Sequence, residues 1–135
     1  MKTFAHWDET LQALEISRGK IIKDIAFTAD DTEDGALRFN FTDGSALLIF
    51  DAGRSCCEAR WMHTDDKFSD FHGAEFRGAE LWDGPIEELS RYDNVRESKF
   101  LVIRTSFGAF TVVNYNEHNG YYGGFVMRAR TEAAT

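Results

Sequence analysis

Apolar residues at the start of the chain follow a helical spacing. Four of them recur at intervals of three or four positions: Phe4, Trp7, Leu11 and Leu14. This spacing places them on one face of an α-helix. Asp8 and Glu9 would lie in the first turn, where negative charge is favourable beside the helix dipole. The pattern predicts a short amphipathic helix over residues 4–16, which ends before Gly19.

The period changes to two from residue 21 onward, as in a β-strand. Between residues 37 and 41 apolar residues alternate with Arg38 and Asn40, and Asp43-Gly44 then predicts a tight turn into a returning strand. A second hairpin is expected over residues 100–115. We expect six apolar side chains of these strands to be buried: Leu37, Phe39, Phe41, Phe100, Val102 and Val113.

Turn-forming residues divide the rest of the chain into short pieces. Asp83-Gly84-Pro85 predicts a turn, and the polar residues 86–97 predict a loop. Asn119-Gly120 predicts a hairpin turn before a last strand over residues 121–129.

The sum of these elements predicts the α+β class. We expect mainly antiparallel β-structure, with about seven to eight short strands in a curved sheet or barrel-like sandwich. An N-terminal helix and one short internal helix, near residues 64–73, complete the expected fold. A single domain is expected over residues 1–130, followed by a disordered polar tail over residues 131–135.

Composition and charge narrow the possible partners and the compartment. The chain has 135 residues, of which 43% are hydrophobic, enough for one core, and its net charge is −8. An acidic surface repels phosphate, so we expect no general nucleic-acid binding and no membrane binding. No apolar run approaches the roughly 20 residues of a membrane helix, and charge comes too early for a signal peptide. These features favour a cytoplasmic protein.

The first segment with dense chemistry is residues 55–66. It holds adjacent thiols at Cys56 and Cys57, followed by the carboxylate of Glu58 and the imidazole of His63. Adjacent cysteines close only a strained ring, so we expect both to be reduced and at least one to be buried.

The second segment, residues 114–125, combines amides, a Glu-His pair and adjacent tyrosines. Hydrogen-bonding side chains beside aromatic faces are typical of a ligand or partner surface. Strand ends of a small antiparallel domain can meet on one rim, so we expect Glu58 or His63 to lie near the turn at 119–122 and to share one concave patch with it. The candidate binding residues are Glu58, His63, Asn116, Glu117, His118, Asn119, Tyr121 and Tyr122.

Structural roles remain open for the same residues. The tyrosines can pack across strands, and Glu58 can bond backbone amides or pair with an arginine. Cys57, His63 and His118 have the chemistry of metal ligands, but their spacing matches no standard zinc pattern. We therefore expect no metal and no cofactor.

The same two segments resemble a family of small uncharacterised phage and prophage proteins. The resemblance is carried by Cys56-Cys57-Glu58, by His63-Thr64-Asp65-Asp66 and by the run from Asn116 to Phe125, and it extends over about residues 19–129. The hairpin from Thr105 to Thr111 also matches. The resemblance implies a phage-type accessory protein that works in a bacterial cytoplasm, but it implies no mechanism.

The leading hypothesis is a binding module that engages a host macromolecule or sequesters a small ligand, and so blunts a defence system. Its expected partners are a host protein or a small molecule, with homo-oligomers also open. The alternative is a small hydrolase-like enzyme that uses Glu58, His63, Glu117 and His118, with or without a metal. A third hypothesis is a structural or assembly role without a site.

Overall fold

Two antiparallel sheets form the body of the protein. The computed structural model describes residues 8–30, 33–53, 58–89, 94–119 and 123–134. Its elements are, in order, α1 (Asp8–Ser17), β1 (Ile22–Asp30), β2 (Glu33–Phe41), β3 (Ala46–Asp51), β4 (Ala59–His63), the 3₁₀ turn η1 (Phe68–Phe71), β5 (Phe76–Leu89), β6 (Asn94–Thr105), β7 (Gly108–His118) and β8 (Met127–Glu132).

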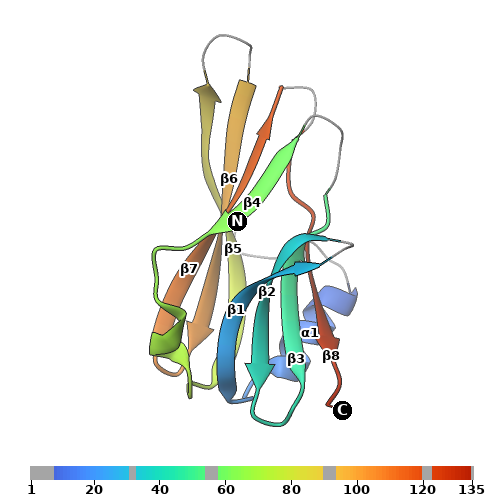
Figure 1. The fold of residues 1–135 in the computed structure, drawn as a ribbon, viewed down its shortest axis with the longest axis vertical. Coiled ribbons are helices and arrows are strands. Elements are labelled where there is room, and N and C mark those ends of the chain that lie inside the picture. The colour runs from blue at the N-terminus through green and yellow to red at the C-terminus, as the bar shows by residue number, and fades with distance from the viewer. Residues whose placement is uncertain (1–7, 31–32, 54–57, 90–93, 120–122, 135) are drawn as a thin grey trace.

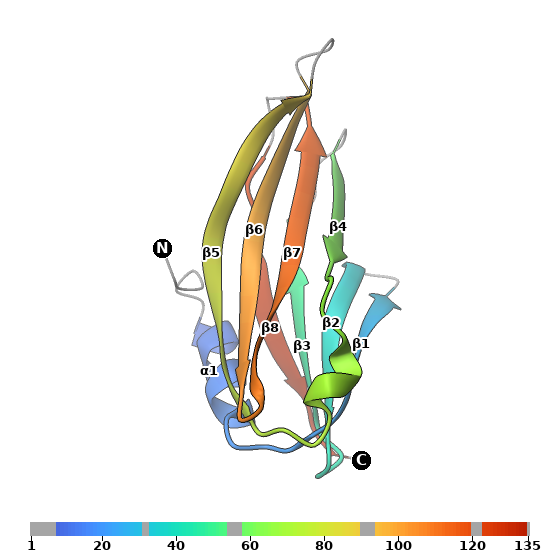
Figure 2. The same ribbon diagram turned by 90° about the vertical axis from the view of Figure 1, so that its left-hand side faces the viewer.

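The sheets stack as two layers. The first sheet has the strand order β1-β2-β3-β8 and the second has the order β4-β7-β6-β5, and Figures 1 and 2 show them face to face. Helix α1 contacts β8, β5 and β3, so it lies beside the edge strands of both sheets. The expected α+β class with mainly antiparallel strands is confirmed, in the form of a sandwich. Among the described residues, no helix is long and apolar enough to cross a membrane.

The inner face of the first sheet has the predicted register. Leu37, Phe39 and Phe41 are at most 2% exposed. The ring of Phe39 lies 5.3 Å from that of Phe76, edge to face, and 6.4 Å from that of Phe110. Strand β2 thus places its alternating aromatic side chains against the second sheet.

The predicted register of the second sheet is wrong. Phe100, Val102 and Val113 are only half-buried and lie on its outer face, whereas their neighbours Leu101, Ile103 and Val112 are fully buried. Residues 100–103 and 112–113 are apolar at every position, so alternation alone does not decide which of them face inward. Polar residues further along β7 occupy inward positions, which reverses the pattern expected there.

Strand β5 continues through the predicted turn at residues 83–85. Ile86–Leu89 and Asn94–Glu97 belong to strands, so the predicted turn and loop are both wrong there. A shift in pairing between Asp83 and Ile86 marks a bulge, and Pro85 is tolerated because β5 is an edge strand. A Cβ on Gly84 would lie 2.5 Å from the Ser98 hydroxyl, which donates to the Pro85 carbonyl at 2.9 Å. Glycine is needed at this close approach.

The end of the chain joins the first sheet. Strand β8 pairs with β3, whereas β7 pairs with β4 and β6. The predicted hairpin across Asn119-Gly120 is therefore wrong, because the segment between β7 and β8 crosses from one sheet to the other. Strand β8 also includes Thr131 and Glu132, two residues of the expected tail. Helix α1 ends close to its predicted end, and residues 1–7 lie outside the described ranges.

Truncation of Phe39 tests the core. Phe39→Ala is expected to lower the free energy of unfolding by about 3–5 kcal/mol, because it leaves a cavity among packed rings. Phe100→Ala is the matched control and should cost less, since Phe100 is only half-buried. Urea denaturation measures both. A loss below about 1 kcal/mol for Phe39→Ala would place this side chain on the surface.

The turn between β2 and β3 gives the protein a pH-dependent contact. Asp43 accepts a hydrogen bond from the Ser45 amide at 2.8 Å and lies 3.1 Å from the Lys20 ammonium. The hydrogen bonds from the Ser45 hydroxyl and amide, with Lys20, lower the pKa of Asp43 from 3.8 to about 2. A lowered pKa contributes stability that is present above pH 4 and is lost as the pH falls through 2. We expect Asp43→Asn to be less stable than the wild type near neutral pH and to approach it over this acid range. A difference that stays constant in denaturation experiments across that range would contradict this assignment.

Candidate functional site

Strands β4 and β7 bring the two chemistry-bearing segments together. Their register places Ala59 opposite Glu117 and His63 opposite Val113. The Asn116 side-chain amide lies 3.5 Å from a carboxylate oxygen of Glu58. Glu58 is therefore a neighbour of the second segment, although the two are far apart in sequence.

The alternation of β7 divides the candidate residues between two faces. Asn116 and His118 point inward and are buried, whereas Glu117 points outward and pairs with Arg96 at 2.8 Å. Because strand neighbours face opposite sides, Glu117 and His118 leave β7 on opposite faces and bind different partners within the chain.

Several candidates lie away from this point. His63 is at the far end of β4, about 13 Å from Ala59 at the usual rise per residue, and its exposed ring bonds Asp65 at 2.9 Å. Asn119 directly follows β7. Tyr121 and Tyr122, like Cys56 and Cys57, lie outside the described residues. Of the four residues of the hydrolase alternative, His63 therefore lies away from Glu58, Glu117 and His118.

The inner face of the second sheet changes from apolar to polar along its length. On β7 the inward side chains are, in order, Phe110, Val112, Asn114, Asn116 and His118, and all are buried. The opposite positions on β6 change in the same way, from Ile103 and Leu101 to Lys99 and Glu97. Polar contacts must therefore hold the layers together at this end.

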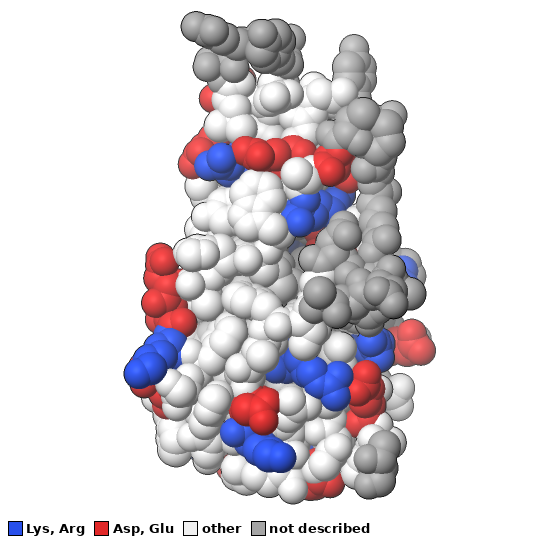
Figure 3. Space-filling view, viewed as in Figure 1, with Lys and Arg blue, Asp and Glu red and all other residues white. Residues whose placement is uncertain are grey.

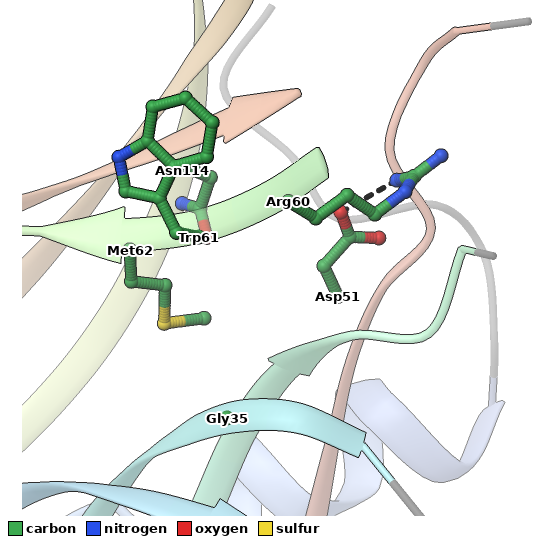
Figure 4. A pocket seen from close by; sticks show the side chains of 6 residues that line it. All are labelled: Gly35, Asp51, Arg60, Trp61, Met62 and Asn114. Carbon is green, nitrogen blue, oxygen red and sulfur yellow. Dashed lines mark hydrogen bonds and ion pairs between the residues drawn. The ribbon is translucent and has the colours of Figure 1, made fainter. Parts of the chain in front are cut away.

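The centre of the polar end is Arg60. One guanidinium nitrogen lies 2.6 Å from Asp51 and another lies 2.8 Å from Glu58. All three side chains are at most 10% exposed. Asp51 ends β3 in the first sheet and Arg60 belongs to β4 in the second, so this contact joins the two layers (Figure 4). Burial alone would lower the pKa of Arg60, but its hydrogen bonds to Glu58 and Asp51 outweigh burial and raise it.

Side chains of the polar end also bond the backbone that follows β3 and the backbone that leads into β8. Asp51 accepts hydrogen bonds from the amides of Gly53 and Val126, both at 3.0 Å. The Gly124 carbonyl accepts from Arg60 at 3.0 Å and from Asn116 at 3.2 Å. We call six side chains the polar end cluster: Asp51, Glu58, Arg60, Glu97, Asn116 and His118.

Glu97 completes this cluster. One of its carboxylate oxygens accepts the Gly124 amide at 3.0 Å, and the other lies 2.7 Å from Nε2 of His118. Strand β6 is thereby tied to both β7 and the crossing segment.

The space between the sheets at this end is small. Asn114 lines a cavity of about 10 Å³ together with Asp51, Arg60 and Met62, which is room for about one water molecule. In Figure 4, Met62 points from β4 toward β2 and Trp61 points away on the other side. The side-chain oxygens of Asn114 and Asn116 are buried and accept no hydrogen bond. An organic ligand does not fit here.

A larger hollow lies at the rim of the polar end. Its volume is about 310 Å³, and its lining consists of Glu58, Ala59, Leu89, Asn94, Glu117 and His118. Figure 3 shows a row of acidic atoms across the molecule near the level of the upper end of β4, with basic atoms at one end of the row and directly below it.

Acidic groups outnumber basic ones around this hollow. Glu58 and Glu117 line it, while Asp51 and Glu97 lie behind the lining, in contact with Arg60 and His118. The guanidiniums of Arg60 and Arg96 balance only two of these four carboxylates. Such a site favours a cation. Across the part of the chain that the structure describes, no group of three or more His, Cys, Asp or Glu residues is placed to hold a metal ion.

Sequence reasoning missed three residues that organise this end. Asp51, Arg60 and Glu97 were not among the candidates, yet each connects separate elements. A signal for Arg60 exists, because the period of two puts it on the same face as Met62 and opposite to Trp61. An arginine that shares a face with a core methionine indicates a buried charge with a partner.

Comparison with known proteins gives one match. A family model described as a domain of unknown function, DUF7448, matches residues 15–127. No curated protein and no solved structure matches the chain. The matched range includes every member of the polar end cluster.

Removal of the Arg60 charge tests the cluster. Arg60→Met is expected to lower the free energy of unfolding by about 3–5 kcal/mol, because it leaves Asp51 and Glu58 buried without their cation. Arg104→Met is the control, since Arg104 pairs with Glu80 at the surface and should change stability by less than about 1 kcal/mol. Equal losses for both variants in urea denaturation would show that the cluster does not hold the layers together.

Proposed function

The chain belongs to the DUF7448 family, and we propose that it is a binding module that holds a cationic group of a partner protein in the hollow at the polar end of the second sheet. The group is the ammonium of a lysine or the guanidinium of an arginine. The observation that carries this proposal is the excess of carboxylates that line a hollow of about 310 Å³ or lie directly behind its lining.

Size and charge both support this ligand class. The volume is at the lower end of the range for small-molecule sites, about 300–1,000 Å³, so one long side chain fits. Glu117 is 32% exposed, so it faces the solvent from which a partner would approach. A positively charged partner also suits a chain with a net charge of −8.

Binding is favoured over hydrolysis because the candidate acids and bases are already engaged. Glu58 bonds Arg60, Glu117 bonds Arg96 and His118 contacts Glu97. A general base must reach the proton it removes, and these groups point at one another instead. Side chains that are paired in this way suit recognition better than proton transfer.

The resemblance to phage and prophage proteins supplies the setting of the proposal. The partner is then a bacterial host protein, met in the cytoplasm, and the bound surface blocks a host defence. A basic region on the host protein would provide the cationic side chain.

A titration with capped amino acids tests the proposal. The probes are N-acetyl-arginine amide and its neutral isostere, N-acetyl-citrulline amide, observed by amide NMR. We expect the cationic probe to shift the signals of Glu58, Ala59, Asn94 and His118, and to bind more tightly than the citrulline probe.

Two variants make this titration specific. Glu117→Gln should weaken the cationic probe about fivefold, since it removes one unit charge near the ligand. Glu132→Gln is the matched control, because this carboxylate pairs with Arg38 in the first sheet, and it should bind like the wild type. Equal binding of both probes, or shifts confined to another region, would refute the cationic site.

A further inference from the structure

The outer face of the second sheet carries a continuous apolar strip. Its members come from all four strands: Trp61, Trp82, Phe100, Val102, Val113 and Tyr115. We call this set the aromatic strip. Figure 2 shows this sheet in front, and no described helix or strand lies over it.

The aromatic strip is ordered and partly exposed. Trp61 is 37% exposed, and its ring stacks on that of Tyr115 at 5.1 Å. The Arg96 guanidinium lies 6.0 Å from the Trp61 ring and 5.9 Å from the Tyr115 ring. The other members are half-buried. A contiguous apolar area of this kind marks an interaction surface on a soluble domain.

The charges around the aromatic strip are mostly paired within the chain. At one end Arg96 pairs with Glu117 and lies 3.9 Å from Glu87. At the other end Arg104 pairs with Glu80 at 2.8 Å. The face is therefore nearly neutral on a chain of net charge −8, so two copies can meet here without bringing unbalanced acids together.

We propose that the occupant of this face is a second copy of the chain, in a two-fold dimer that packs the two aromatic strips against each other. This inference is independent of the proposed function, because the cationic site lies at the rim and the dimer uses the outer face. Phe100 is midway between Arg96 and Arg104 on β6. A two-fold axis near Phe100 and across the strands brings the Arg96 end of one copy to the Arg104 end of the other.

The two ends of the strip are complementary in this arrangement. The Arg96 end has two carboxylates, Glu87 and Glu117, for one guanidinium. Arg104 and Glu87 are both half-exposed, at 53% and 55%, so each has room for a second contact. Arg104 of one copy then meets Glu87 of the other, and the symmetry makes this contact twice.

The face approaches the size that a dimer needs. Four strands about 4.8 Å apart and the stretch from Arg96 to Arg104, at about 3.3 Å per residue, span roughly 20 by 30 Å. This flat area of about 600 Å² grows when the relief of the side chains is counted, and stable interfaces bury about 800 Å² per partner.

Sedimentation velocity over a range of concentrations tests the dimer. We expect a monomer–dimer equilibrium that Trp61→Ser weakens by at least about tenfold, as for an anchor residue of an interface. Phe107→Ser is the matched control, because Phe107 is 60% exposed at the turn between β6 and β7, and it should leave the equilibrium unchanged. A wild-type protein that stays monomeric, or a dimer that Trp61→Ser leaves intact, overturns the proposal.

A charge exchange tests the orientation and does not depend on the aromatic side chains. Arg104→Glu and Glu87→Arg should each weaken the dimer, and the double variant should restore it, because the contact re-forms with reversed signs. Circular dichroism confirms that each variant is folded. Failure of the double variant to recover overturns the two-fold arrangement, whatever the capped amino acids do at the rim.

Discussion

One buried guanidinium joins the two sheets where the apolar core ends. Arg60 reaches from the second sheet to Asp51 of the first and also holds Glu58 beside it. Because a buried ion is costly without its partners, the positions of β3, β4 and the segment before β8 are linked to one another. Glu58 also lines the rim hollow, so the geometry of the hollow depends on this contact.

The change of polarity along the second sheet explains the functional surfaces. Its inner face is apolar around Phe110 and Val112 and polar from Asn114 to His118. The polar half binds the backbone of the crossing segment and leaves an excess of carboxylates at the rim. The apolar residues of this half, such as Tyr115, face outward instead. The alternation of apolar and polar side chains is thus reversed in this half of the sheet, and this one change produces both the acidic rim and the apolar outer face.

Sequence patterns predicted the fold class and the first sheet well. Leu37, Phe39 and Phe41 alternate with polar residues, so only one register buries them. The same reasoning fails for the second sheet. Both Val112 and Val113 are apolar, so alternation does not indicate which of them faces inward. In addition, the polar residues Asn114 and Asn116 face inward. Polar residues can face inward there because the Asn114 amide donates to the Lys99 carbonyl and the Asn116 amide donates to the Gly124 carbonyl. These acceptors lie on another strand and on the crossing segment, which the local sequence pattern does not reveal. For the same reason the sequence indicated Glu58, Asn116 and His118 as neighbours in one region, but not Asp51 and Glu97, whose roles depend on the crossing between sheets.

The most direct test of this account is hydrogen exchange at the amides of Gly53 and Val126. Both amides donate to the carboxylate of Asp51 and lie outside the strands. If the Arg60 contacts hold the layers together, these two amides exchange as slowly as strand amides of the core, such as that of Ile49. Exchange at the rate of an unprotected loop would show that the polar end is open in solution and that Arg60 does not join the sheets.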